Sequence, residues 1–290
     1  MRLIIVSGLS GSGKSVALAM LEDLEYYCVD NIPAGLLPGF IAYTVRTSEP
    51  AYRLTAVGVD ARNRPEDLAD VPRLVAELRR SGIGCEVLFL RADNDTLLKR
   101  FSETRRRHPL SRSGVGLQEA LEQEQRMLAP VANAADLTVD TSRLSVHELR
   151  ELVRERVVDR KGGGPSLLFQ SFAYRHGVPD DADFVFDARA LPNPYWEPAL
   201  RDCTGRDAAV AEFMSRHEDA ARFLDDITRF LEHWLPSLVR SNRSYLTVAI
   251  GCTGGQHRSV YLAEKLAAHF DGQYGRALIR HRDLSSRKHE

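Results

Sequence analysis

Features that mark several protein classes are scarce or missing in this chain of 290 residues. Its four cysteines form no CxxC pair and do not have the spacing of a metal site; they are Cys28, Cys85, Cys203 and Cys252. No apolar run approaches the length that crosses a membrane, and Met1-Arg2 with the four apolar residues after it is too short for a signal peptide. We therefore expect a cytoplasmic protein that keeps its thiols reduced.

The chain also lacks a charge excess and low-complexity tracts. Its formal net charge of −1 means that nucleic-acid binding would need a local basic patch. With 43% hydrophobic and 27% charged residues, the composition is that of an ordinary globular protein. A length of 290 residues predicts about two domains, each large enough for its own core.

Strand and helix patterns alternate along the chain and restart after one linker, Lys161-Gly162-Gly163-Gly164-Pro165. The expected strands cover residues 3–6, 26–29, 54–59, 86–90, 136–139, 167–172, 184–187 and 246–250. The expected helices cover residues 16–24, 33–47, 66–80, 95–107, 117–128, 207–238 with a break near Glu218, and 260–270. Such alternation predicts βαβ units and parallel sheets. We expect an α/β fold with one domain over residues 1–160 and a smaller α/β domain over residues 165–290.

The most specific motif lies between the first expected strand and the first expected helix. It matches the Gly-x-x-x-x-Gly-Lys-Ser phosphate-binding loop, or P-loop, at every fixed position. Its residues are Gly8, Leu9, Ser10, Gly11, Ser12, Gly13, Lys14 and Ser15. In this motif backbone N–H groups at a helix N-terminus wrap phosphate oxygens, the lysine reaches the β- and γ-phosphates, and the serine hydroxyl ligates Mg²⁺. The motif therefore predicts a nucleotide site.

Two aspartates end the next expected strands. Asp30 follows the second strand and Asp60 the third, and ligands of open parallel sheets bind at the carboxyl ends of the strands. One carboxylate could hold Mg²⁺ through water while the other orients a nucleophile; alternatively, each caps a turn or a helix. We expect the catalytic set to be Lys14, Ser15, Asp30 and Asp60, with Ser15 and Asp60 at the metal.

Five arginines cluster around the end of the expected helix 95–107: Arg100, Arg105, Arg106, Arg107 and Arg112. Such a cluster can close over the charge of a triphosphate, or it can complement the helix dipole in solvent. Three adjacent arginines exceed what a helix end needs, so we expect Arg105 and Arg107 to bind the nucleotide.

The remaining loop of this domain and its overall pattern suggest a kinase. The exit of the last strand, residues 136–142, could touch the base. Taken together, the domain resembles small-molecule P-loop kinases of the adenylate, shikimate or gluconate type. No acceptor-binding segment is recognisable between Asp30 and Asp60, however.

A second glycine-rich loop, Gly251–Ser259, follows a strand and opens a helix but lacks the lysine of the first. Three interpretations are open. The loop binds a phosphomonoester or sugar phosphate through Arg258 and backbone N–H groups. It is the loop of a thiol phosphatase, because Cys252 and Arg258 have C-x₅-R spacing. It is a structural turn with a buried cysteine.

The C-terminal segment from Arg276 onward is basic. It could grip a phosphodiester backbone, or it could be a solvated tail. Its candidate RNA contacts are Arg280, Arg282, Arg287 and Lys288.

Seven stretches spread over the chain resemble the RapZ/YvcJ family of bacterial nucleotide-binding proteins: GLSGSGKSVAL, YYCVDNIP, VDARN, TRRRHPL, DTSRLSVHEL, FVFDARALPNPYW and SYLTVAIGCTGGQHRSVYLAE. The resemblance implies an N-terminal P-loop domain with ATPase and GTPase activity. Residues 8–15 would form the ATP site, and a GTP-associated site would comprise Asp60, Ala61, Arg62 and Asn63.

The same resemblance implies a C-terminal domain similar to a phosphofructokinase subdomain, able in some members to sense glucosamine-6-phosphate. The sugar phosphate would then lie on Cys252, Thr253, Gly254, Gly255, His257 and Arg258. Self-association as a tetramer or dimer is implied as well, and enteric members present a small RNA to a ribonuclease. Tyr195 stands where we expect histidine in enteric members, which indicates a distant branch.

Two phosphate loops on one chain without an evident acceptor pocket favour a regulatory protein with slow ATP and GTP hydrolysis. Its second domain would sense a phosphorylated metabolite and could bind RNA. The alternatives are a small-molecule kinase with Asp30 as the base, and an RNA-binding adapter to a ribonuclease in which the P-loop acts as a switch.

Overall fold

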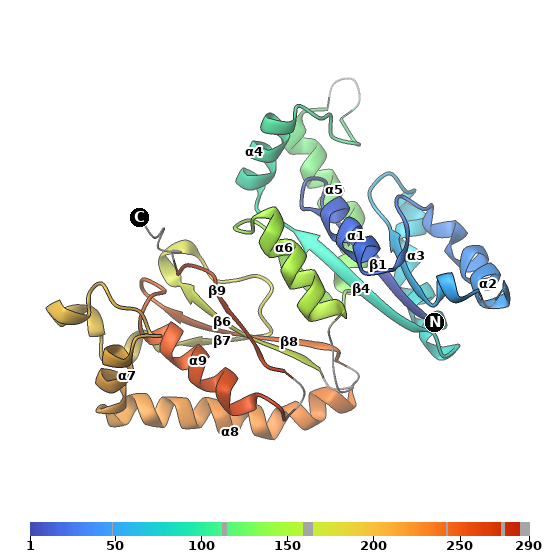
Figure 1. Ribbon diagram of the computed structural model, residues 1–290. Coiled ribbons are helices and arrows are strands. Elements are labelled where there is room, and N and C mark those ends of the chain that lie inside the picture. Colours follow the sequence, from blue (N-terminus) through green and yellow to red (C-terminus); the bar gives the residue numbers. More distant parts are fainter. Residues whose placement is uncertain (48, 112–114, 159–164, 242, 274–275, 285–290) are drawn as a thin grey trace. The chain divides into compact units, whose positions relative to one another are not determined.

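The computed structural model describes residues 1–47, 49–111, 115–158, 165–241, 243–273 and 276–284 (Figure 1). The chain divides into two compact units, Met1–Asp159 and Arg160–Glu290. Each unit has its own sheet and its own apolar core. Four residues of the expected linker, Lys161, Gly162, Gly163 and Gly164, lie outside the described residues.

The first unit is built on a five-stranded sheet in the order β2-β3-β1-β4-β5, with every neighbouring pair parallel. Its strands are β1 (Arg2–Gly8), β2 (Tyr27–Val29), β3 (Leu54–Gly58), β4 (Gly84–Arg91) and β5 (Leu137–Asp140). The central strand β1 is buried from its second residue onward, because helices cover both faces of the sheet. The expected α/β class with parallel sheets is confirmed.

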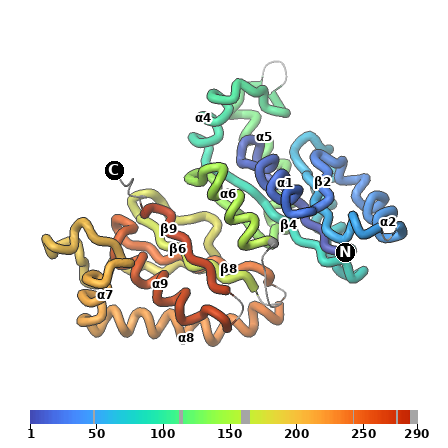
Figure 2. The backbone as a smooth tube through the Cα atoms, viewed as in Figure 1, coloured from blue at the N-terminus to red at the C-terminus, as the bar shows by residue number. Residues whose placement is uncertain are grey.

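Six helices flank this sheet: α1 (Lys14–Asp23), α2 (Leu37–Thr47), α3 (Pro65–Arg80), α4 (Asn94–Thr104), α5 (Leu117–Asn133) and α6 (Val146–Val153). α1 packs against α6 on one face, and α3 packs against α5 on the other (Figures 1 and 2). The neighbouring strands β1 and β3 therefore continue into helices on opposite faces. A crevice forms at such a point in an open sheet, and it is where ligands bind.

The second unit holds a four-stranded parallel sheet in the order β7-β8-β6-β9. Its strands are β6 (Ser166–Ala173), β7 (Phe184–Asp187), β8 (Tyr245–Cys252) and β9 (Leu278–His281), and its helices are α7 (Ala208–Ser215), α8 (Glu218–Arg240) and α9 (Arg258–Phe270). Apolar residues of α8 and α9 pack on β6 and β8 to form its core. In the part of the chain that the structure describes, no helix is long and apolar enough to cross a membrane.

Several elements differ from the sequence predictions; α5, for example, runs to Asn133 rather than to residue 128. α4 ends at Thr104 rather than at residue 107, because Arg105 takes the left-handed conformation with a φ of 52°. α6 was not predicted, although Ser145 and Glu148 form a capping box at its start. β9 was also missed, so Arg280 lies in a strand and not in a solvated tail.

Candidate functional site

A pocket of about 670 Å³ opens at the carboxyl end of β1. That volume suits a nucleotide-sized ligand. Every residue of the P-loop, from Gly8 to Ser15, lies in its wall. The rest of the wall comes from α1, from α4 and the segment after it, and from residues near the ends of β3 and β5 and the start of α6: Val16, Asp60, Arg62, Arg100, Phe101, Thr104, Arg106, Arg107, Pro109, Thr141, Leu144, Ser145, Val146 and Leu149.

The P-loop leaves the start of α1 without a side-chain cap. Gly13 occupies the N-cap position in the left-handed conformation, with a φ of 104°, and no side chain accepts a hydrogen bond there. This φ favours glycine, and a Cβ atom on Gly13 would also lie 2.6 Å from Leu149 Cδ2, so the leucine side chain would have to shift. Because the first N–H groups of a helix need external acceptors, this end of α1 is suited to bind an anion.

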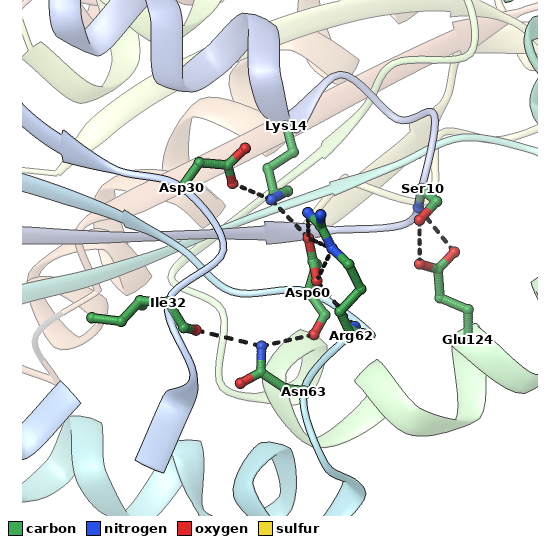
Figure 3. A network of polar contacts seen from close by, with 8 residues as sticks. All are labelled: Ser10, Lys14, Asp30, Ile32, Asp60, Arg62, Asn63 and Glu124. Atoms are coloured by element: carbon green, nitrogen blue, oxygen red, sulfur yellow. Dashed lines mark hydrogen bonds and ion pairs between the residues drawn. The ribbon is translucent and has the colours of Figure 1, made fainter. Parts of the chain in front are cut away.

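Lys14 joins two carboxylates that come from neighbouring strands (Figure 3). Its ammonium group pairs with Asp30, which follows β2, and lies 2.9 Å from Asp60 Oδ2, which follows β3. The side chains of Lys14 and Asp60 are 12% and 6% exposed, whereas that of Asp30 is 48% exposed. The pair with Asp60 is therefore the more strongly held of the two, because solvent weakens an exposed ion pair.

Asp60 is held ionised by its neighbours. Arg62 donates to it from the backbone N–H at 3.0 Å and from Nε at 3.1 Å, and Arg62 Nη2 lies 2.5 Å from Oδ2. Burial acts to raise the pKa of Asp60, but the hydrogen bonds from Arg62 and Lys14 and the charge of Lys14 outweigh it and lower the pKa to about 2. Asp60 is thus a permanently charged acceptor at the centre of the pocket.

Asn63 and Ala61 support this arrangement from behind. Asn63 Oδ1 accepts a hydrogen bond from the N–H of Ala34 at 2.6 Å, and its amide nitrogen donates to the carbonyls of Ile32 and Asp60. Ala61 is 2% exposed within the core. Of the four residues expected at a GTP-associated site, Asp60 and Arg62 line the pocket, Asn63 joins the loops after β2 and β3, and Ala61 is part of the apolar core.

The last residue of β3 must be small. A Cβ atom on Gly58 would lie 2.5 Å from Asp30 Oδ1 and 3.2 Å from the backbone nitrogen of Asn31. Asn31 itself has a φ of 55°. Gly58 therefore lets the turn after β2 fold over the end of β3, which brings Asp30 within reach of Lys14.

The arginines expected around the end of α4 differ in their placement. Arg100 Nη1 donates to the Gly11 carbonyl and to Thr141 Oγ1, both at 3.0 Å, and burial lowers the pKa of this guanidinium. Arg106 and Arg107 are exposed and line the pocket, whereas Arg105 is the C-cap of α4. Arg112 lies outside the described residues.

Two residues near the P-loop were not expected from the sequence. Glu124 of α5 is fully buried and accepts hydrogen bonds from Ser10, and His108 is 3% exposed and contacts the same carboxylate. A signal for Glu124 did exist. It lies on the apolar face of its helix, at helical spacing from the buried Leu121, Leu128 and Val131.

The second glycine-rich loop turns its reactive side chains inward. Cys252, His257 and Arg258 are 3%, 6% and 4% exposed. Cys252 Sγ lies 3.1 Å from Ser259 Oγ and accepts a hydrogen bond from the N–H of Gly255. An attacking thiolate must be accessible to its substrate, so this burial argues against a thiol phosphatase.

Arg258 and His257 bind backbone carbonyls. Arg258 Nη1 donates to the carbonyls of Arg189 and Leu191 at 2.9 and 3.0 Å, and His257 Nε2 lies 2.9 Å from the carbonyl oxygen of Leu200. Arg258 Nε has no partner within the described part of the chain. Thr253 is exposed and Gly254 is half-buried.

The expected RNA contacts are differently placed. Arg280 belongs to β9, whereas the guanidinium of Arg282 pairs with Asp283 at 3.1 Å, bonds the carbonyl of Gly177 and is only 8% exposed. Arg287 and Lys288 lie outside the described residues.

Family models match both parts of the chain. The RapZ-like N-terminal domain matches residues 1–161, and the RapZ C-terminal domain matches residues 165–285. A nucleotide-binding protein of Thioalkalivibrio sulfidiphilus is 55% identical, and one of Nitrosococcus oceani is 54% identical. Each alignment covers 98% of this chain and 100% of the relative. Among solved structures, shikimate kinase from Acinetobacter baumannii is 18% identical, covering 55% of this chain and 94% of that chain with a TM-score of 0.34.

Proposed function

The chain belongs to the RapZ-like family, and from that premise we propose that it is a nucleotide-binding regulatory protein that hydrolyses ATP and GTP slowly. The observation that carries the proposal is the position of Lys14. Its ammonium group lies between two carboxylates in a pocket walled by the complete P-loop. Both relatives reported above are named for nucleotide binding.

Binding begins with an exchange of partners at Lys14. The β- and γ-phosphates attract the ammonium group away from Asp30, whose half-exposed carboxylate is the weaker of its two partners. The buried Asp60 keeps its contact and orients the lysine. Asp30 is then free to accept a hydrogen bond from the water that attacks the γ-phosphate, which is the positioning role that such reactions require.

The oxygen ligands near Lys14 suit Mg²⁺. Ser15 is exposed in the first turn of α1, and Asp60 supplies an ionised carboxylate. The described residues contain no cluster of three metal-binding side chains, which agrees with a cation that takes one carboxylate and completes its shell with phosphates and water. Ser15 and Asp60 would hold this ion, which when bound neutralises phosphate charge.

One pocket serves both nucleotides in this proposal. Asp60 and Arg62, from the GTP-associated stretch, lie in the same wall as the P-loop. Leu144, Val146 and Leu149 supply an apolar surface at the start of α6. An apolar contact with a purine ring discriminates weakly between adenine and guanine, because it leaves the polar edges of the base unread.

Lys14→Ala tests the site. Removing the ammonium takes away the cation that contacts the phosphates and leaves Asp30 without its ion-pair partner, while Asp60 keeps only Arg62, so we expect affinity for ATP and for GTP to fall about 100-fold or more and hydrolysis to stop. The matched control is Lys99→Ala, because Lys99 is 77% exposed on α4. Hydrolysis by Lys14→Ala at the wild-type rate would refute the assignment.

Arg258 favours a second function, the binding of a sugar phosphate such as glucosamine-6-phosphate in the second unit. Among the described residues its buried Nε has no hydrogen-bond partner, Arg258 is the first residue of α9, whose start has no side-chain cap, and Thr253 of the same loop is exposed. We expect Thr253→Glu to abolish binding of glucosamine-6-phosphate in a calorimetric titration, because the added charge repels phosphate, and Thr253→Val to weaken it slightly. Equal binding by glucosamine, which lacks the phosphate, would refute this site. RNA binding and self-association stay predictions of the sequence.

A further inference from the structure

A buried carboxylate lies directly against the P-loop on the side away from the pocket. Glu124 Oε2 accepts the N–H of Ser10 at 2.9 Å, and Oε1 accepts its hydroxyl at 2.7 Å (Figure 3). His108 Nε2 contacts the same Oε2 atom at 3.0 Å. Both the Glu124 and His108 side chains are fully shielded from solvent.

The hydrogen bonds of His108 define its tautomer. The N–H of Leu110 donates to His108 Nδ1 at 3.1 Å, so Nδ1 carries no proton. Nε2 therefore carries the ring proton and donates it to Glu124. The ring also packs on Phe101, with the ring centroids 5.3 Å apart. His108 is thus held from two sides, and its position depends on Glu124.

This arrangement is unusual for the core of an anion-binding domain. Burying a carboxylate is unfavourable unless hydrogen bonds compensate, and here three donors do so. An apolar side chain would fill the same space without placing negative charge behind a phosphate loop. The carboxylate does one thing that an apolar residue cannot: it joins Ser10 of the P-loop to His108.

His108 directly follows the two arginines that line the pocket. Arg106 and Arg107 are exposed, and the segment that carries them is attached to the P-loop at both ends. Arg100 bonds the Gly11 carbonyl at the start of this segment, and His108 reaches Ser10 through Glu124 at its end.

We propose that Glu124 and His108 are positioning residues that set the distance of Arg106 and Arg107 from the phosphates bound by the P-loop. The inference rests on the nucleotide site proposed above. Glu124 and His108 do not line the pocket, so they act through the two arginines, whose positive charges they place near the phosphates in the transition state. A displacement of about 1 Å in such groups slows a reaction by about 100-fold.

His108→Phe tests the proposal, because phenylalanine keeps the ring against Phe101 and removes the proton donated to Glu124. We expect kcat for ATP hydrolysis to fall 10- to 100-fold while KM changes less than threefold. His108→Gln places an amide N–H near the former Nε2 and should recover at least half of the wild-type kcat. Glu124→Leu removes the carboxylate that joins His108 to Ser10. Glu122→Leu, at an exposed position of the same helix, is the control.

A double-mutant cycle separates positioning from a structural role. In an Arg106→Ala/Arg107→Ala background, His108→Phe should change kcat less than twofold, because the arginines through which it acts are gone. Equal losses of kcat in both backgrounds would overturn the proposal, and so would unchanged kcat in His108→Phe and Glu124→Leu. An error in the nucleotide site itself would show separately, because Lys14→Ala would then hydrolyse ATP at the wild-type rate.

Discussion

At the scale of single residues, the site depends on how charges are shared around Lys14. One cation faces two carboxylates, and a second cation, Arg62, shares the buried one. Asp60 therefore has two positive partners, whereas Asp30 has one ion-pair partner in the described part of the chain and about half of its side chain exposed to solvent. This difference is the basis for proposing that a triphosphate displaces Asp30 rather than Asp60.

Asp60 should make stability depend on pH in the acid range. Its pKa is lowered to about 2 in the folded protein, against about 3.9 in an unfolded chain, so the ionised form stabilises the fold by about 2 kcal/mol. This contribution is complete above pH 4 and is lost as the pH falls through the folded-state value near 2. We expect Asp60→Asn to be about 2 kcal/mol less stable than wild type at pH 7, and the difference to shrink below pH 4.

Urea unfolding followed by circular dichroism measures that difference. Both tryptophans, Trp196 and Trp234, belong to the second unit. Their fluorescence therefore reports the unfolding of that unit, and Asp60→Asn should not change its urea midpoint. Glu122→Gln serves as the exposed control. A difference between wild type and Asp60→Asn that stays constant from pH 7 to pH 2.5 would contradict the assignment.

Residue types and spacing predicted much of this site, but not all of it. All eight residues of the P-loop line the pocket, because a motif of consecutive residues specifies its own backbone. The sequence placed Asp30 and Asp60 at the carboxyl ends of strands beside the P-loop, but their ion pairs with Lys14 were not predicted. The helical spacing placed Glu124 on the apolar face of its helix, but its contact with His108 and Ser10 was missed, because that contact is tertiary and no local pattern contains it.

At the scale of elements, strands were located better than the segments that end helices. The buried strands β1 and β6 stand out as apolar runs, because helices cover both faces of a parallel sheet. α4 was predicted three residues too long, since helical spacing continues through Arg105–Arg107 while the backbone turns at Arg105. β9 was missed, because only four residues form it and just two of them, Leu278 and Ile279, are apolar.

Replacing either of two glycines by alanine should change the free energy of unfolding, in opposite directions at the two positions. At Gly58, the end of β3, a methyl group meets Asp30 and the backbone of Asn31, so we expect Gly58→Ala to lower the free energy of unfolding by about 1–3 kcal/mol. At Gly39, within α2, nothing lies within 4 Å of the new atom, and Gly39→Ala should raise it by about 0.5–1 kcal/mol. Urea midpoints of the two variants check both signs, and a Gly58→Ala protein as stable as wild type would show that the close approach is not constraining.

At the scale of the whole molecule, two units repeat a strand, a glycine-rich loop and a helix, with different chemistry in each loop. In the first unit the cations Lys14, Arg106 and Arg107 line the pocket. In the second, Arg258 uses Nη1 on backbone carbonyls, and its buried Nε has no partner in the described part of the chain. The sequence showed both loops but could not show this difference, because side-chain direction depends on which carbonyls the fold brings near.

The exchange of partners at Lys14 is the central claim, and a calorimetric titration of ATP with Mg²⁺ into wild type and Asp30→Asn tests it most directly. Asparagine removes the carboxylate that competes with phosphate for the lysine, so we expect Asp30→Asn to bind ATP about three- to tenfold more tightly than wild type, while hydrolysing it more slowly. Unchanged or weaker binding of ATP by Asp30→Asn would contradict the claim.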